Sequence, residues 1–176
     1  MIDTDRLRFL PVTAREAAAC QKILADPDMG RWSGLPTGLS RTAAEHFVNG
    51  MVRLHTERRG IALAVWHQET VIGFARISNL RHKTGAATLS YEIGVPYWRQ
   101  GFGTEIVQAL VRLGHDTLRL NRLDARVFCG NPPGARVVEK AGFQLEGTLR
   151  EDGDLHGTRR DIWLYARLKR DPLPAN

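Results

Sequence analysis

Long apolar runs, paired cysteines and clustered metal ligands are all missing from this sequence of 176 residues. The longest uninterrupted apolar run, Ile61 to Trp66, is far shorter than the roughly 20 residues that span a bilayer. Only Cys20 and Cys129 are present, which excludes a disulfide framework. The six histidines form no H-x-x-x-H or Cys/His cluster, so we expect no metal site. Because the N-terminus also lacks the apolar stretch of a secretory signal, we expect a cytoplasmic protein with no membrane partner.

Lysine is scarce as well, because 21 of the 25 cationic residues are arginine, and the formal net charge is +6. Such a charge favours anionic partners, either nucleic acid or a phosphorylated cofactor. A nucleic-acid binder is expected to carry a basic stripe with interspersed aromatics. Here no block of five or more like charges occurs and only 7% of the residues are aromatic. We therefore expect no direct contact with nucleic acid.

The length and composition are those of one globular domain. Alternating and helical patterns predict a strand, two helices, three strands, a helix, a strand, a helix and two strands. The predicted strands are Arg6–Leu10, Ile61–His67, Val71–Ser78, Ala87–Gly94, Arg122–Phe128, Gln144–Arg150 and Arg160–Leu168. The predicted helices are Thr13–Leu24, Thr42–Arg59, Thr104–Leu118 and Gly134–Ala141. This order predicts a single α/β domain over residues 3–168 and a short tail over residues 169–176.

Two predicted loops and one helix start complete this assignment. Loops are predicted over Asp28–Leu39 and Asn79–Gly85, where glycine, proline and polar residues gather. Thr42 and Glu45 have the spacing of a capping box, which would start the second helix.

The stretch W98-R99-Q100-G101-F102-G103-T104-E105 joins a predicted strand to a predicted helix. At such a junction, free backbone amides and the helix dipole favour an anion, and glycine lets the backbone approach a phosphate closely. A simple tight turn is the alternative. The third glycine of a Rossmann loop and the Lys-Ser/Thr pair of a P-loop are both absent, so a phosphate here would belong to another class of cofactor.

The strand before this stretch carries the candidate catalytic acid. Its alternation places Thr88, Ser90 and Glu92 on one face. Near the strand's end, Glu92 is a candidate general base for deprotonating an amine. A structural acid that pairs with an arginine is the alternative.

Two further positions are candidates for binding. Asn131, directly before two prolines, is suited to cap a helix. Trp32 lies beside Arg31 in a predicted loop, where a large aromatic is either the wall of a pocket or a residue of the core or of a dimer interface.

Four segments, in this order along the chain, resemble the GNAT superfamily of acetyl-CoA-dependent N-acetyltransferases: Y91-E92-I93-G94, then W98 to E105, then N131 with E139-K140-A141-G142-F143, then R160-D161-I162-W163-L164-Y165. The opening D5-R6-L7-R8-F9-L10-P11 is similar to the branch that acetylates the N-terminal serine or alanine of ribosomal proteins. The resemblance implies a mixed, mostly antiparallel sheet of about seven strands flanked by about four helices. It also implies that the fourth and fifth strands splay apart around acetyl-CoA, the cosubstrate.

The resemblance further implies roles for single residues. Glu92 would be the general base, and the amide of Val95 would polarise the acetyl carbonyl. The residues that bind acetyl-CoA would be Ile93, Val95, Arg99, Gln100, Gly101, Phe102, Gly103, Thr104 and Asn131. The acceptor site would be lined by Arg31, Trp32, Ser90 and Glu92. The family's usual proton donors are a serine and a tyrosine, and Gly134 and Val138 stand in their places.

We therefore expect an enzyme that moves acetyl from acetyl-CoA directly to a primary amine in a ternary complex. A protein N-terminus is the first choice of acceptor, and a small amine, an amino acid or an antibiotic is the alternative. Because Gly134 and Val138 leave the proton donor unidentified, a CoA-binding sensor without catalysis is a second alternative. A homodimer is compatible with either.

Overall fold

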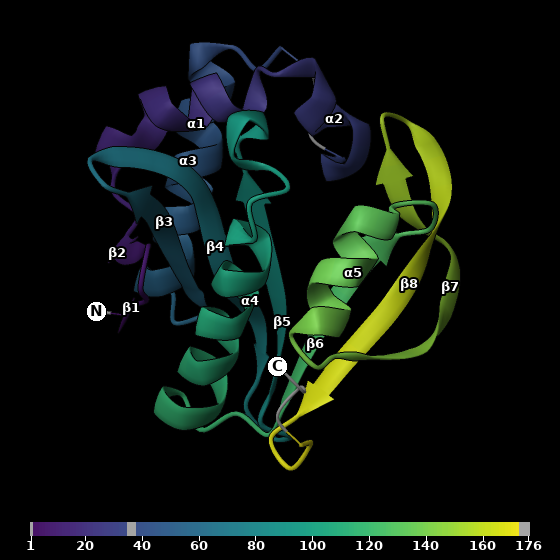
Figure 1. Cartoon of the computed structure of the whole chain (residues 1–176). Coiled ribbons are helices and arrows are strands. Elements are labelled where there is room, and N and C mark those ends of the chain that lie inside the picture. Colours follow the sequence, from purple (N-terminus) through teal and green to yellow (C-terminus); the bar gives the residue numbers. More distant parts are fainter. Residues whose placement is uncertain (1, 35–37, 173–176) are drawn as a thin grey trace.

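A computed structural model describes residues 2–34 and 38–172, and within them eight strands form one sheet in the order β1-β2-β3-β4-β5-β6-β8-β7 (Figure 1). The strands are β1 (Ile2–Asp3), β2 (Arg8–Pro11), β3 (Ile61–His67), β4 (Thr70–Arg81), β5 (Ala86–Ile93), β6 (Arg122–Phe128), β7 (Gln144–Leu155) and β8 (Thr158–Leu168). All neighbours are antiparallel except β5 and β6. The expected α/β class and the mixed, mostly antiparallel sheet are confirmed, with the two-residue β1 as the strand beyond the seven predicted.

Within the described ranges, five α-helices cover the two faces of the sheet: α1 (Ala17–Leu24), α2 (Pro27–Ser33), α3 (Arg41–Thr56), α4 (Phe102–Arg112) and α5 (Pro132–Lys140). A 3-10 turn at Val95–Tyr97 precedes α4, and a π-helical turn at Leu113–Thr117 follows it. One buried cluster joins α1 and α3 to the sheet through Cys20, Val48 and Phe74. The other joins α4 and α5 to the opposite face through residues such as Ile106 and Val138. The side chains of β5 that point to one face of the sheet therefore lie on the side of α1 and α3, and those that point to the other face lie on the side of α4 and α5.

The two parallel strands part along their length. β5 and β6 pair only where Ala86–Leu89 meets Arg122–Ala125. Beyond this point β5 continues to Ile93 and β6 to Phe128 without pairing to each other. Because both strands run in the same direction, their carboxyl ends lie at the same, open end of the sheet (Figure 1). The expected splay between the fourth and fifth predicted strands is confirmed.

The loop predicted over Asp28–Leu39 is wrong over its first half. Residues Pro27–Ser33 form α2, and the Oδ1 of Asp26 caps it by accepting from the amide of Asp28 at 3.0 Å. Proline is favoured at the first position of a helix, so Pro27 begins this helix, while the preceding helix ends at Leu24 as predicted. Residues 35–37 of the predicted loop lie outside the described residues.

Two other boundaries also differ from the sequence-based expectation. The capping box of Thr42 and Glu45 is wrong, because the Oγ of Ser40 caps α3 by accepting from the amide of Ala43 at 3.2 Å. Glu45 instead forms an exposed ion pair with Arg41 at 3.0 Å. The predicted loop from Asn79 also starts too early, because β4 continues to Arg81.

Candidate functional site

The loop between Trp98 and α4 exposes a group of unused backbone amides. Arg99 and Gly101 both have left-handed backbone angles, with φ of 60° and 82°. The first amide of α4 that bonds within the helix belongs to Glu105 and donates to the Gly101 carbonyl at 3.1 Å. In the part of the chain that the structure describes, the amides of Phe102, Gly103 and Thr104 donate to no other atom. Three donors and a helix dipole thus converge at one helix N-terminus, which favours an anion.

Gly103 lies where three elements approach one another. A Cβ at this position would lie 3.4 Å from the hydroxyl of Tyr91 on β5 and 3.4 Å from Cγ2 of Val137 on α5. Burial, with the charge of Glu92 second, raises the pKa of Tyr91 above its ordinary value. The tyrosine therefore stays protonated and presents a neutral hydroxyl beside the free amides. Sequence reasoning missed it, although strand alternation already places it on the face opposite to Glu92.

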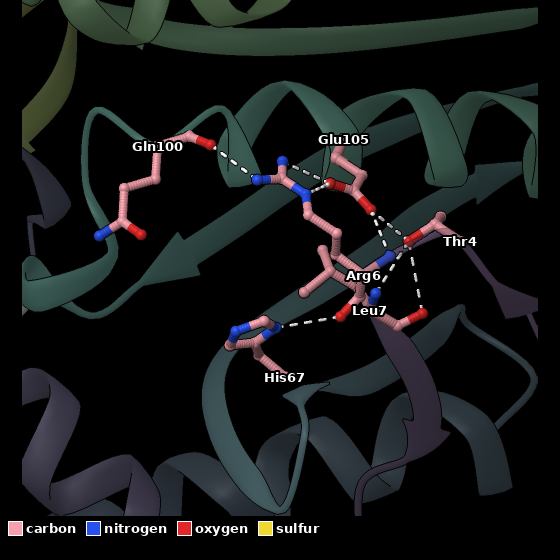
Figure 2. A network of polar contacts seen from close by, with 6 residues as sticks. All are labelled: Thr4, Arg6, Leu7, His67, Gln100 and Glu105. Carbon is pink, nitrogen blue, oxygen red and sulfur yellow. Dashed lines mark hydrogen bonds and ion pairs between the residues drawn. The ribbon is translucent and has the colours of Figure 1, made fainter.

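Arg6 attaches the N-terminal segment to this loop (Figure 2). Its Nη2 lies 2.6 Å from Oε2 of Glu105 on α4, and its Nε donates to the same oxygen at 2.8 Å. Its Nη1 donates to the carbonyl of Gln100 at 3.0 Å. The guanidinium carbon also lies 4.2 Å from the centre of the Phe102 ring. One side chain thus fixes both ends of the loop that carries the free amides, which we call the amide loop (Arg99–Thr104).

Glu105 is the centre of this network of contacts, which we call the Arg6 anchor (Thr4, Arg6, Gln100, Phe102 and Glu105). Its Oε1 accepts from the hydroxyl of Thr4 at 2.5 Å and from the amide of Arg6 at 3.2 Å. Burial raises the pKa of Glu105, but hydrogen bonds from Thr4 and Arg6, together with the Arg6 charge, outweigh it and hold the pKa below its usual range. The carboxylate therefore stays charged and keeps the anchor formed at neutral pH.

The end of β5 is tied to the same loop by Trp98. Its indole Nε1 donates to the carbonyl of Ile93 at 2.7 Å, and its amide donates to the carbonyl of Val95 at 3.1 Å. The amide of Val95 donates to no atom of the described residues. Val95 thus places one more free N–H donor at the open end of the splay.

Only one of the two carboxylate oxygens of Glu92 has a hydrogen-bond partner among the described residues. Oε1 accepts from Nη2 of Arg76 on β4 in an ion pair whose side chains are 12% and 14% exposed. Arg76 also donates from Nε to Oγ of Ser90 at 3.0 Å and stacks at 5.3 Å on the ring of Phe47. Oε2 of Glu92 is buried and has no hydrogen-bond partner among the described residues. The arginine pairing that the sequence left open is present, and one oxygen remains for a further donor.

Cys20 on α1 lies close enough to Glu92 to interact with its charge. The pKa of this thiol is raised to about 12, chiefly by burial and also by the charge of Glu92, against the opposing effect of Arg76. A thiol with this pKa stays protonated at neutral pH, so it is a poor nucleophile. This environment favours direct attack by an amine over transfer through a cysteine.

Asn131 is the N-cap of α5, as its position before two prolines predicted. Its Oδ1 accepts from the amide of Gly134 at 3.1 Å. A Cβ at Gly134 would lie 2.7 Å from Nδ2 of Asn131, which explains why a serine does not fit there without displacing the cap. Val138 is buried in the core.

Tyr165 on β8 is a buried hydroxyl close to α5. It donates to Oε1 of Glu139 at 2.9 Å. Burial raises its pKa to about 12, and the hydrogen bond and charge of Glu139, with a smaller effect from Cys129, act in the same direction. This phenol therefore stays protonated across the neutral range.

The remaining predicted residues, Arg31 and Trp32, lie on α2 and line a separate pocket with Cys129, Gly130, Leu155 and Arg160. Among the described residues there is no group of three or more side chains that could hold a metal ion. Within the same residues, no helix has the length and apolar character needed to cross a membrane.

Comparisons with known proteins agree with this geometry. The family model described as "Acetyltransferase (GNAT) domain" matches residues 6–144. The uncharacterized N-acetyltransferase YoaA of Bacillus subtilis is 32% identical over 171 residues, which are 96% of this chain and 97% of that protein. The ribosomal-protein-serine acetyltransferase of Escherichia coli is 26% identical over 121 residues, 69% of this chain and 68% of that protein.

A solved structure shows the same fold. RimJ of Mycobacterium smegmatis, in complex with a CoA disulfide, has a TM-score of 0.84 at 22% identity, with 92% of this chain and 81% of that chain covered. The family match spans most of the chain, and the splayed strands and the amide loop lie within it. The chain therefore belongs to the GNAT family and is an acetyl-CoA-dependent N-acetyltransferase.

Proposed function

We propose that this enzyme acetylates the N-terminal α-amine of a protein, with acetyl-CoA bound where β5 and β6 part. The observation that carries the chemistry is the buried, unpartnered Oε2 of Glu92 at the same end of the sheet as the free amides of the α4 N-terminus. The choice of acceptor is supported by two relatives whose names refer to ribosomal acetylation: the putative ribosomal N-acetyltransferase YdaF of Bacillus subtilis and the ribosomal-protein-serine acetyltransferase of Escherichia coli.

The chain offers a cradle that suits the phosphates of acetyl-CoA. The amides from Arg99 to Thr104 would hold the pyrophosphate, since the three at the start of α4 have no other partner. A Cβ at Gly103 would already be in van der Waals contact with Tyr91 and Val137, so the backbone approaches both residues closely. Ile93 and Asn131 would lie along the pantetheine arm. Acetyl-CoA supplies the acetyl group as an activated thioester.

The remaining groups would move protons and stabilise charge. Oε2 of Glu92 would take the first proton from the acceptor ammonium, directly or through a water, while Oε1 stays bound to Arg76. The Val95 amide would donate to the acetyl oxygen as the new nitrogen–carbon bond forms and the carbon–sulfur bond breaks. A thiol with a pKa near ~8.5 leaves readily as a thiolate, so the sulfur would leave without a proton donor. The thiolate would then take up the second amine proton through solvent.

Glu92→Gln tests this assignment. Glutamine keeps an oxygen for Arg76 but cannot take a proton, so we expect turnover on an alanine-initiated peptide to fall roughly 10²-fold. The shift in melting temperature caused by acetyl-CoA should stay nearly unchanged. Glu45→Gln, at the exposed pair on α3, is the matched control and should change neither quantity. Unchanged turnover in Glu92→Gln would show that the residue has only a structural role.

An acceptor panel tests the substrate class. Peptides with different first residues are compared with free amino acids and small polyamines, using release of the CoA thiol as the readout. Faster turnover of the peptides is expected. A preference for the free amino acids or polyamines would contradict the proposal of a protein N-terminus and would support the small-molecule alternative.

A further inference from the structure

Two arginines from distant parts of the chain, Arg31 on α2 and Arg160 on β8, line one pocket of about 330 Å³. No acidic side chain is among its lining residues, which also include Trp32, Cys129, Gly130 and Leu155. Within the described residues neither arginine forms an ion pair, and Arg31 instead lies 5.8 Å from the ring of Trp32. The pocket therefore combines an aromatic surface with two exposed arginines that form no ion pair in the described part of the chain.

The wall that α2 contributes is fixed before any ligand binds. His156, in the turn between β7 and β8, donates from Nε2 to the carbonyl of Gly30 at 2.5 Å. Gly34 ends α2 with a left-handed φ of 63°, and a Cβ there would lie 3.0 Å from the carbonyl of Asp154. The ring of Trp32 lies 3.6 Å from where a Cβ of Gly130 would be. A backbone wall held in this way lowers the ordering cost of binding.

The pocket lies at the end of the sheet where the chemistry is proposed. Cys129 and Gly130 directly follow β6, and Glu92 is close to the end of β5. These strands are parallel, so the two ends are neighbours across the splay. Figure 1 shows α2 over this open end, beside α1. Because Cys20 of α1 interacts with the charge of Glu92, α2 belongs to the same side of the sheet as the general base.

We propose that this pocket binds an anionic group, a carboxylate or a phosphate, carried by the amine acceptor, with an apolar part of the acceptor against Trp32. This inference rests on the proposed acetyl transfer. Guanidinium groups match both anions because they donate two parallel hydrogen bonds. A pocket of this volume suits one side chain or one small molecule. The enzyme thus selects amines that have a negative charge close to the reacting nitrogen.

The test uses four peptide amides that begin with alanine and differ only at the second residue, which is glutamate, phosphoserine, glutamine or lysine. The kcat/KM for the glutamate or phosphoserine peptide should exceed that for the glutamine peptide by about tenfold, and the better of the two identifies the anion. Arg31→Ala and Arg160→Ala should each reduce this preference severalfold. Arg160→Glu should shift the preference toward lysine.

One control separates a specific effect from general charge, and a second tests whether the effect is electrostatic. Arg159→Ala removes the same charge from the neighbouring position, which does not line the pocket and pairs loosely with Glu151 at 3.7 Å, and it should leave the preference unchanged. In wild type, raising the salt to about 0.5 M should reduce the preference, because exposed charges are screened at that ionic strength.

Other outcomes would overturn the inference. Equal turnover of the four peptides, or a preference that survives in both Arg31→Ala and Arg160→Ala, would refute it and leave acetyl transfer intact. If these variants lose the melting shift caused by acetyl-CoA, the pocket serves the cosubstrate, and the assignment to the acceptor is wrong. Absence of turnover on every amine in wild type would defeat the proposed function and this inference with it.

Discussion

Replacing Arg6 by alanine removes the contacts that connect the N-terminal segment to the amide loop. The ion pair with Glu105, the hydrogen bond to the Gln100 carbonyl and the stacking on Phe102 are all lost. Arg6 is 44% exposed and Glu105 is 16% exposed, so solvent limits the ion pair to about 1 kcal/mol. Stacking of the guanidinium on an aromatic ring adds about 0.5–1 kcal/mol. We expect the free energy of unfolding to fall by about 1.5–2 kcal/mol.

The effect on acetyl-CoA binding has a different origin. Arg99 has a left-handed φ of 60°, a conformation that costs a non-glycine residue about 1 kcal/mol or more. Without the anchor at Gln100, the loop can relax from this conformation, and acetyl-CoA must then restore it. We expect the Kd for acetyl-CoA to rise about tenfold, which corresponds to ~1.4 kcal/mol.

Calorimetric titration with acetyl-CoA and denaturant unfolding measure the two effects separately. Arg6→Lys, which keeps the charge but not the forked geometry, should lie between wild type and Arg6→Ala. Arg41→Ala is the matched control, because the Arg41–Glu45 pair is 82% and 45% exposed and its loss should leave the Kd unchanged. A lower stability in Arg6→Ala with an unchanged Kd would refute the reasoning, since the loop would then keep its shape without the anchor.

The anchor also predicts a pH dependence. The pKa of Glu105 lies below its usual range in the folded protein, so the stability that it contributes is present above the ordinary carboxyl pKa of about 4.3 and is lost as the pH falls through the lowered value. The stability difference between wild type and Arg6→Ala should therefore be full at pH 6 and should shrink in more acidic solution.

The remaining predictions concern α5 and β8. Gly134→Ser should displace the Asn131 cap and lower the unfolding free energy by about 1 kcal/mol, with turnover changed by only a few-fold; a gain near ~100-fold would instead reveal a restored general acid. Because the pKa of Tyr165 is raised to about 12, its contribution to stability is present below about pH 10 and is lost as the pH rises through the raised value, so Tyr165→Phe should flatten this alkaline loss in equilibrium unfolding. Turnover should stay level to about pH 9, and a descending limb abolished by Tyr165→Phe would identify the missing proton donor.

Much of the fold followed from local patterns. The alternation in Arg122–Phe128 predicted β6 with the bounds that the structure has, because a strand buried among hydrophobic neighbours has few competing interpretations. The pattern failed at α2, where the glycines and the proline of Asp28–Leu39 indicated a loop. Asp26 and Pro27 are a local start signal for this helix, whereas its contacts with His156 and Asp154 join residues too far apart in the sequence for a local pattern to report.

The site was predictable to a similar extent. Gly101 is recognisable because its left-handed backbone angle is a local need, whereas the partner of Glu92 depends on how β4 and β5 are paired. The register places Arg76 opposite Ser90 and Phe74 opposite Glu92, so Arg76 reaches Glu92 diagonally. That register could not be derived from the sequence, because the loop between β4 and β5 was predicted to begin at Asn79, whereas β4 continues to Arg81. The pairing of Arg6 with Glu105 has no local signal at all.

The Arg6 anchor has a consequence for how the molecule folds and opens. Thr4 and Glu105 are separated by 101 positions in the chain, so the anchor forms only after a long loop has closed, which makes such contacts late events. β1 and β2 form one edge of the sheet, where local unfolding is easiest. When this edge opens, the amide loop loses its support, so the two regions form one cooperative unit. A ligand that binds at the start of α4 therefore slows hydrogen exchange in the first strands of the chain.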